Sequence, residues 1–211
     1  MNVKELKINH ILEKGFELFS ESGIDNVTMT NIAEKANIGV ASLYRYFVTK
    51  EELAIQCATK MWQTQQEKAQ DFFSSKEYVE KTGLSQVESI FQYFESSFDT
   101  TQEFYRFIYY FDSYIKRQNI PTSSLQNYEK IIEEITFTAY KAIEKGISDG
   151  SVKNRNFAEN PQTLTLTLMH SFFSLAQKLS LSGGMLHQDI STPPKLQLET
   201  LKKLIIAALS I

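Results

Sequence analysis

Apolar residues recur at intervals of three and four positions through most of the chain, the spacing that places them on one face of an α-helix. Residues 4 to 22 show this spacing first, and Gly23 follows where a helix C-cap is expected. The residues on their shared face are Ile8, Leu12, Phe16 and Phe19. No segment alternates apolar and polar residues as a half-buried strand would. The pattern therefore predicts an all-α protein.

Two short helices follow the first one. Thr28 is placed to cap a helix of about two turns, whose inward residues are Ile32, Ala33 and Ala36. Asn37 stands where the chain must turn, and Asn tolerates the left-handed conformation better than any residue except Gly. A third helix is predicted from about residue 40 to residue 46.

Capping signals divide the rest of the chain into longer helices. Thr49 to Glu52 forms a capping box that opens a helix to about residue 75, and Ser85 to Glu88 forms a second box that opens a helix to about residue 99. Another helix is predicted from about 102 to 118. A periodic segment after Pro121 ends at Gly150, and Asn160 with Pro161 begins a helix that stops at Gly183. A last helix follows Pro194.

Two short helices joined by a tight turn are what the major groove of DNA accepts. Ala33 is small enough for the two helices to cross closely, and Asn37 supplies the turn four positions later. Leu43 and Phe47 are expected to anchor the second helix against Ile8, Phe16 and Ile32. The predicted architecture is an N-terminal three-helix, helix-turn-helix head at residues 1–53, followed by a larger helical body for ligand binding and dimerisation at residues 54–211.

This head resembles the TetR family of bacterial regulators. The match is gapless over residues 27–33, 38–47 and 49–53, and the helical remainder has the length and architecture typical of that family. The resemblance implies a DNA-binding transcriptional regulator that acts as a homodimer on a double-stranded DNA operator.

The resemblance also implies residue roles. Thr28 and Thr30 would approach phosphates at the start of the second helix. Ser42, Tyr44 and Tyr46 would offer hydroxyls to the DNA backbone, with Lys50 as a further phosphate contact. Val40 and Ala41 would select sequence through thymine methyl groups, and Arg45 would contact either a guanine or a phosphate. Alternatively, Tyr44 or Tyr46 packs against the body.

Three positions depart from the family pattern. Gly39 stands where the family usually has a serine, just before the recognition helix. Val40, at the next position, stands where the family usually has a lysine or a similar polar residue. These changes weaken a cap and remove a polar base contact, so we expect the protein to select its site more through methyl contacts and DNA shape. Asn37 replaces a glycine at the turn, which is conformationally neutral.

Overall charge does not point to DNA. The chain of 211 residues has a formal net charge of −3, and residues 1–53 carry six basic against eight acidic residues. Only between residues 28 and 50 do basic residues prevail, with Lys35, Arg45 and Lys50 against Glu34. Any contact with phosphates must therefore be local.

Composition excludes several other classes of protein. The single cysteine, Cys57, rules out an internal disulfide and fits a buried thiol in a reducing compartment. Three histidines without a cluster predict no metal site, and no motif predicts a cofactor. No apolar stretch is long enough to span a membrane, so we expect a cytoplasmic protein with no membrane partner. An all-α enzyme lacks any acid–base pair or nucleophile motif to support it.

The body is rich in aromatic residues, with eleven between Phe91 and Tyr114. In the resembled family, the body encloses a small-molecule pocket. Each of these aromatics is at least as well explained as ordinary core. An aromatic lining predicts a small hydrophobic or aromatic effector, and His170 is either a polar anchor for it or a core histidine. The candidate lining residues are Trp62, Phe94, Phe98, Phe107, Phe111, Tyr140 and Phe172.

The last two long helices carry apolar stripes that need a partner. In the resembled family such a pair forms a four-helix bundle with its two-fold mate, whereas the alternative is packing within one chain. Operator binding also requires a dimer, because two heads must contact two DNA half-sites whose centres lie about 34–36 Å apart. The candidate dimerisation residues are Leu164, Leu168, Leu175 and Leu179 on the first helix and Leu201, Leu204 and Ile205 on the second.

Together these features predict a homodimeric repressor whose body binds a small molecule and whose fourth helix, beginning at Lys50, transmits the change to the heads. A ligand that fits the body better when the heads are splayed would shift the population away from the DNA-competent state. The competing interpretation is a helical adaptor that binds only protein.

Overall fold

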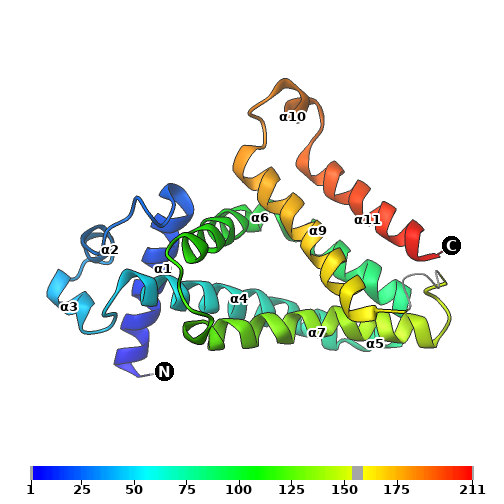
Figure 1. The fold of residues 1–211 in the computed structure, drawn as a ribbon, viewed down its shortest axis with the longest axis horizontal. Helices are drawn as coiled ribbons and strands as arrows, with labels where there is room; N and C mark the ends of the chain where they lie inside the picture. The colour runs from blue at the N-terminus through cyan, green and yellow to red at the C-terminus, as the bar shows by residue number, and fades with distance from the viewer. Residues whose placement is uncertain (1, 154–158, 211) are drawn as a thin grey trace. The chain divides into compact units, whose positions relative to one another are not determined.

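The computed structural model describes residues 2–153 and 159–210, which form helices and connecting segments with no strand (Figure 1). This confirms the all-α prediction. No helix within the described residues has both the length and the apolar character needed to cross a membrane. The helices are α1 (Val3–Ser22), α2 (Met29–Lys35), α3 (Val40–Tyr44), α4 (Lys50–Ser74), α5 (Lys76–Glu80), α6 (Gly83–Arg117), the 3-10 helix η1 (Thr122–Ser124), α7 (Gln126–Ser148), α9 (Pro161–Ser182), α10 (His187–Ser191) and α11 (Pro194–Ser210).

The chain divides into two structural units by its internal contacts. The first comprises Met1–Gln65 and Glu103–Ile131, and the second comprises Gln66–Gln102 and Ile132–Ile211. The first unit therefore includes the three N-terminal helices together with parts of α4, α6 and α7. The functional boundary expected at residue 53 stays a prediction.

Helix α1 and its neighbours build the core of the first unit. Asn2 and Glu5 form a reciprocal capping box that begins α1. The ring of Phe107 packs against Phe16 and Phe19, with centroid distances of 5.3 and 6.3 Å. Apolar side chains spaced at helical intervals thus meet from α1 and α6. Other fully buried members of this core are Ile32, Leu43, Phe47, Leu53 and Ala54.

Cys57 lies fully buried in this core, in agreement with the structural role expected for it. Its thiol donates to the carbonyl oxygen of Leu12 at 3.3 Å. Burial raises the pKa of the Cys57 thiol far above its ordinary value, because the thiolate would lose its hydration. The residue is therefore inert packing rather than a reactive nucleophile.

The prediction of two helices between residues 85 and 118 is wrong, because α6 is continuous from Gly83 to Arg117. The polar run at residues 99–102 does not cap a new helix. The hydroxyls of Thr100 and Thr101 both donate to the carbonyl oxygen of Ser97, one turn back in the same helix. The Ser85 box is also wrong, since the helix begins earlier and the amide of Ser85 donates to the hydroxyl of Thr82.

In the second unit, α9 and α11 pack side by side and are connected through α10 (Figure 1). Asn160 caps α9 by accepting from the amide of Thr163, and Pro161 is its first residue, as predicted. The single-turn helices α5 and α10 carried no sequence signal. A buried ion pair joins α11 to α6, where Lys202 Nζ lies 2.6 Å from Glu95 Oε2.

Helices α6 and α7 cross at two glycines in this unit. A Cβ on Gly83 would lie 1.9 Å from the amide nitrogen and 2.3 Å from the Cα of Gly146. Both positions are buried. The two backbones therefore touch directly, an approach that any side chain at residue 83 would prevent.

Candidate nucleic-acid interface

The turn between α2 and α3 is built by local hydrogen bonds. Thr28 accepts from the amide of Asn31, whose side chain accepts in return from the amide and hydroxyl of Thr28, so α2 begins with a closed capping box. At its other end, Asn37 adopts a φ of 54°, the left-handed conformation predicted for it. The amide of Ile38 then donates to Ala33 O at 2.9 Å.

Helix α3 presents one face to the core and another to solvent. Leu43 and the following Phe47 are buried, as predicted. Tyr44 is 48% exposed, and Tyr46 is half-buried. The helix ends at Tyr44 rather than Tyr46, and its N-cap, Gly39, makes no side-chain bond, as its lack of a hydroxyl implies.

All nine residues expected to contact DNA lie within the first unit, and none is fully buried. Arg45 folds back to donate from Nη2 to the hydroxyl of Ser42 at 2.9 Å. The exposed members are Thr28, Thr30, Ala41, Tyr44 and Arg45, and the half-buried members are Val40, Ser42, Tyr46 and Lys50.

The basic residues of this surface are less available than their number suggests. Lys35 pairs with Glu17 at 3.5 Å, and Glu17 also pairs with Lys14 at 2.5 Å. The hydrogen bond from Lys14, together with the two positive charges, holds the pKa of Glu17 below its ordinary value. Arg45 is also exposed, and no ion pair is found for it within the described residues.

Lys50, the third cation, points its ammonium at backbone carbonyls. Nζ donates to Ile24 O at 2.8 Å and to Val27 O at 3.0 Å, and it lies 5.4 Å from the centre of the Tyr114 ring. It thereby ties the first turn of α4 to the segment between α1 and α2. Its role as a phosphate contact stays a prediction, and it requires these bonds to be exchanged.

The last turns of α6 hold the same region from the other side. The hydroxyl of Tyr114 donates to Glu51 Oε1 at 2.7 Å, and Arg117 pairs with Asp25. The bond from Tyr114 is the main cause that keeps the pKa of Glu51 below its ordinary value, whereas burial and Glu51 raise the pKa of Tyr114. Sequence reasoning missed these contacts because their partners are more than sixty residues apart.

The aromatic residues expected to line an effector pocket mostly pack against other rings. Trp62 is buried edge-on against Phe104, and Phe111 packs on Tyr128. Phe172 lies between Phe91 and Phe94. Phe98 and Phe107 have no exposed surface, and Phe94 is half-buried. Of the seven, Tyr140 alone lines a cavity among those described below.

That cavity is an apolar groove of about 480 Å³ between α7 and α9. Phe137, which is 55% exposed, and Tyr140 line it from α7, and Leu166 lines it from α9. The hydroxyl of Tyr140 donates to Glu144 at 2.6 Å. The groove offers ring surface and aliphatic surface to a ligand, with few polar groups.

The apolar stripes of α9 and α11 are divided between internal packing and solvent. Leu164, Leu179 and Ile205 are buried within the chain, and Leu168, Leu175 and Leu201 are half-buried. Leu204 is 63% exposed. His170 is also exposed, so the expectation of a core histidine is wrong. The outward faces of the two helices therefore combine polar and small residues with exposed leucines.

Comparison with known proteins identifies the head. Residues 11–57 match the family of bacterial regulatory proteins, tetR family. The biofilm operon icaADBC HTH-type negative transcriptional regulator IcaR of Staphylococcus aureus (strain Newman) is 25% identical over 176 residues, which cover 80% of this chain and 84% of that protein.

Solved structures share the fold over nearly the whole chain. A bacterial regulatory protein in the tetR family from Rhodococcus RHA1 gives a TM-score of 0.69 at 15% identity and covers 97% of both chains. FadR from Bacillus subtilis, solved in complex with stearoyl-CoA, gives 0.65 at 14% identity and covers 94% of this chain and 97% of that one. The resemblance of residues 27–53 is thus confirmed, because residues 11–57 match the tetR family of bacterial regulatory proteins, and the chain as a whole shares its fold with a solved structure of that family.

Proposed function

We propose that this protein is a repressor that binds a palindromic operator as a homodimer and releases it when a small hydrophobic or aromatic effector binds. The observation that carries the proposal is the outward face of α3, where Ala41, Tyr44 and Arg45 are exposed above a fully buried Leu43. IcaR, a relative over most of the chain, is a negative transcriptional regulator, which supports repression rather than activation.

The side chains on this face suit a contact with DNA that depends on few charges. Hydroxyls of Thr30, Ser42 and Tyr44 can donate to phosphate oxygens without adding charge. Val40 and Ala41 present methyl groups that fit beside thymine in the major groove. We infer that orientation on the duplex comes from hydroxyls and Arg45, and that sequence choice comes from apolar contacts.

Homodimer formation is supported by the exposed leucines of α11. Leu196 and Leu204 are 49% and 63% exposed in the single chain, where each would cost free energy by facing water. A second copy related by a two-fold axis would cover the same residues on both chains. The dimer would also place two recognition helices on one operator.

The effector is supported by the apolar groove between α7 and α9. Its volume of about 480 Å³ lies within the range of small-molecule sites. Phe137 and Tyr140 provide rings on which a planar or acyl-bearing compound can stack or lie. FadR, which has the same fold, is known in complex with stearoyl-CoA, so the fold accommodates a ligand with a long apolar part.

A mobility-shift titration with the DNA upstream of the protein's own gene tests the proposal. We expect a shift that weakens as salt rises, and loss of that shift in Tyr44→Ala. Tyr109→Ala is the matched control, because Tyr109 is 45% exposed, close to the 48% of Tyr44, but lies on α6. If the wild-type protein shifts no genomic fragment at low salt, the proposal that it is a transcriptional regulator is refuted.

A further inference from the structure

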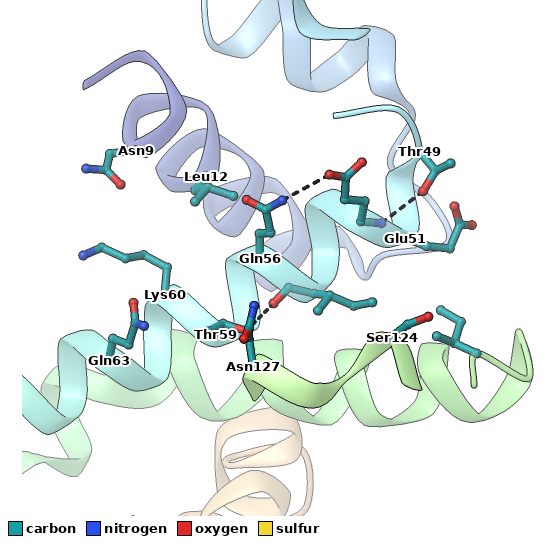
Figure 2. Close-up of a pocket in the computed structure, with 13 residues that line it drawn as sticks. Asn9, Leu12, Thr49, Glu51, Gln56, Thr59, Lys60, Gln63, Ser124 and Asn127 are labelled. Carbon is teal, nitrogen blue, oxygen red and sulfur yellow. Dashed lines mark hydrogen bonds between the residues drawn. The ribbon is translucent and has the colours of Figure 1, made fainter. Parts of the chain in front are cut away.

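A second cavity, of about 720 Å³, lies within the first unit and is separate from the apolar groove. Helix α4 forms one side, and Asn9 and Leu12 of α1 form another (Figure 2). The remaining side is formed by Ile120, by Ser124 of η1 and by Asn127 of α7. The residues expected to line an effector pocket take no part in it. We call it the α4 groove.

The α4 groove has polar walls where neighbouring elements would ordinarily bury apolar ones. Glu52, Gln56 and Thr59 follow one another at intervals of four and three residues, and Lys60 and Gln63 continue the stripe. All five side chains are half-buried between α1 and the residues around 120–127. Within the stripe, Gln56 donates to Glu52 Oε1 at 3.3 Å and the hydroxyl of Thr59 donates to Ile55 O at 2.9 Å. The remaining hydrogen-bonding capacity is open to water or to a ligand rich in polar groups.

Opposite charges lie at the two ends of the groove. Glu51 and Glu52 stand at the start of α4, and Lys60 stands eight residues beyond Glu52, which is about 12 Å along a helix. In Figure 2, Thr49 and Glu51 lie on the right, whereas Lys60 and Gln63 lie on the left near Asn9. The groove therefore separates an acidic end from a basic end.

The groups at the basic end have bonding capacity to spare. In the part of the chain that the structure describes, no hydrogen bond or ion pair is found for the side chains of Lys60, Gln63 and Asn127. At the acidic end, Glu51 accepts from Tyr114, and Glu52 accepts from the amide of Val48. A carboxylate has about four acceptor positions, so both can accept further donors.

We propose that the α4 groove binds a short peptide of three or four residues with free termini. An extended tetrapeptide spans about 13 Å between its terminal amine and carboxylate, which matches the separation of the two charged ends. The amine would bind Glu51 and Glu52, and the carboxylate would bind Lys60. The side-chain amides of Gln56, Gln63 and Asn127 have the donors and acceptors that the peptide's own amides need.

Occupancy of the groove would reach the DNA-binding head through Glu51. A peptide amine at this carboxylate is a second donor beside the hydroxyl of Tyr114. It also lies beside Glu52, whose carboxylate holds the amide of Val48 just after the recognition helix. Peptide binding does not depend on the proposed function, whereas this effect on DNA affinity rests on it.

Equilibrium dialysis of the full chain against a tetrapeptide library, read by mass spectrometry, tests the site. One library has free termini, and a second is acetylated and amidated. We expect the wild type to retain members of the free library and none of the capped one. Lys60→Met should reduce retention at least about tenfold, the cost of one charge-assisted hydrogen bond. Lys68→Met, on the exposed part of the same helix, should retain as the wild type does.

The outcomes separate the site from its consequence. Equal retention of both libraries, no retention of either, or unchanged retention by Lys60→Met overturns the peptide site. Retained peptides are then added to the mobility-shift assay, where at least a tenfold loss of operator affinity is expected. Retention without any change in DNA affinity establishes the site and overturns its link to the head. If the protein binds no DNA at all, the peptide site established by dialysis is unaffected, and the proposed function as a regulator is refuted instead.

Discussion

The hydroxyl of Tyr114, near the end of α6, donates a 2.7 Å hydrogen bond to Glu51 in the first turn of α4. Tyr114 is otherwise buried, with 1% of its surface exposed. The bond joins α6 to α4 within the first unit, one residue after Lys50. Its strength therefore bears on how firmly the start of α4 is held.

Tyr114→Phe removes this donor and leaves the ring in place. We expect the free energy of unfolding to fall by about 1.5 kcal/mol, the lower end of the usual contribution of a hydrogen bond to a charged acceptor, because Glu51 is only half-buried. Urea unfolding followed by circular dichroism measures the change. Tyr109→Phe, at an exposed position of the same helix, should leave stability unchanged. Equal losses in both variants would show that the bond contributes nothing specific.

The same bond predicts a loss of stability in acid. Because the pKa of Glu51 is lower in the folded protein than its ordinary value of 4.5, the folded state favours the carboxylate. The contribution is complete above pH 4.5 and disappears as the pH falls through the lowered pKa. Melting temperatures between pH 7 and pH 3 should show a shallower acid decline in Glu51→Gln than in the wild type. Parallel curves would contradict this.

Lys50 offers a choice between two roles. If its ammonium exchanges the carbonyls of Ile24 and Val27 for a phosphate, Lys50→Met will reduce the slope of log affinity against log salt by about 0.9. We expect this reduction together with a loss of about 1–2 kcal/mol of stability from the lost carbonyl bonds. Lys68→Met is the control for both measurements. A lower stability with an unchanged slope would leave Lys50 as an internal tether only.

Leu204 tests the homodimer. Introducing a charge by Leu204→Glu at a position that is 63% exposed in the single chain should leave the fold intact and weaken self-association at least about tenfold. Light scattering coupled to size exclusion measures the mass over a range of concentrations. Leu6→Glu, at a 51% exposed position of α1, should remain associated. A Leu204→Glu protein with the mass of the wild type would place the interface elsewhere.

The buried pair of Lys202 and Glu95 predicts a strongly asymmetric mutational effect. Lys202→Met should cost about 3 kcal/mol, because it leaves a buried carboxylate without its cation. The double variant Lys202→Met with Glu95→Leu should recover most of that loss, since two apolar side chains can fill the same space. Urea unfolding compares the three proteins. A single variant as stable as the wild type would contradict this and mean that Glu95 finds another partner.

Sequence predicts those parts of this fold that are determined within a few residues. The capping box at Thr28 and the positive φ of Asn37 both follow from neighbours no more than four positions away. The proline that opens α9 is local in the same way. These signals were sufficient for the helix-turn-helix and hence for the family.

Contacts distant in sequence could not be predicted. Nothing near Lys50 indicates that its ammonium turns toward Ile24, and nothing near Glu51 indicates Tyr114. Threonines at 100 and 101 look like a helix start, although their hydroxyls bond within α6. Aromatic residues were equally ambiguous, because core and ligand pocket favour the same side chains and only three-dimensional packing separates them.

The contact between Gly83 and Gly146 has a consequence for how this sequence can vary. Neither glycine adjoins the recognition helix, yet a methyl group at residue 83 would overlap the backbone of α7. In a saturation mutagenesis scored by repression of a reporter, position 83 should therefore accept no replacement, whereas the exposed Ala41 should accept many and change the operator that is bound. Loss of repression in every variant at position 83 would show that the body no longer assembles. Repression retained by many variants at position 41 would show that this residue affects only which DNA is bound.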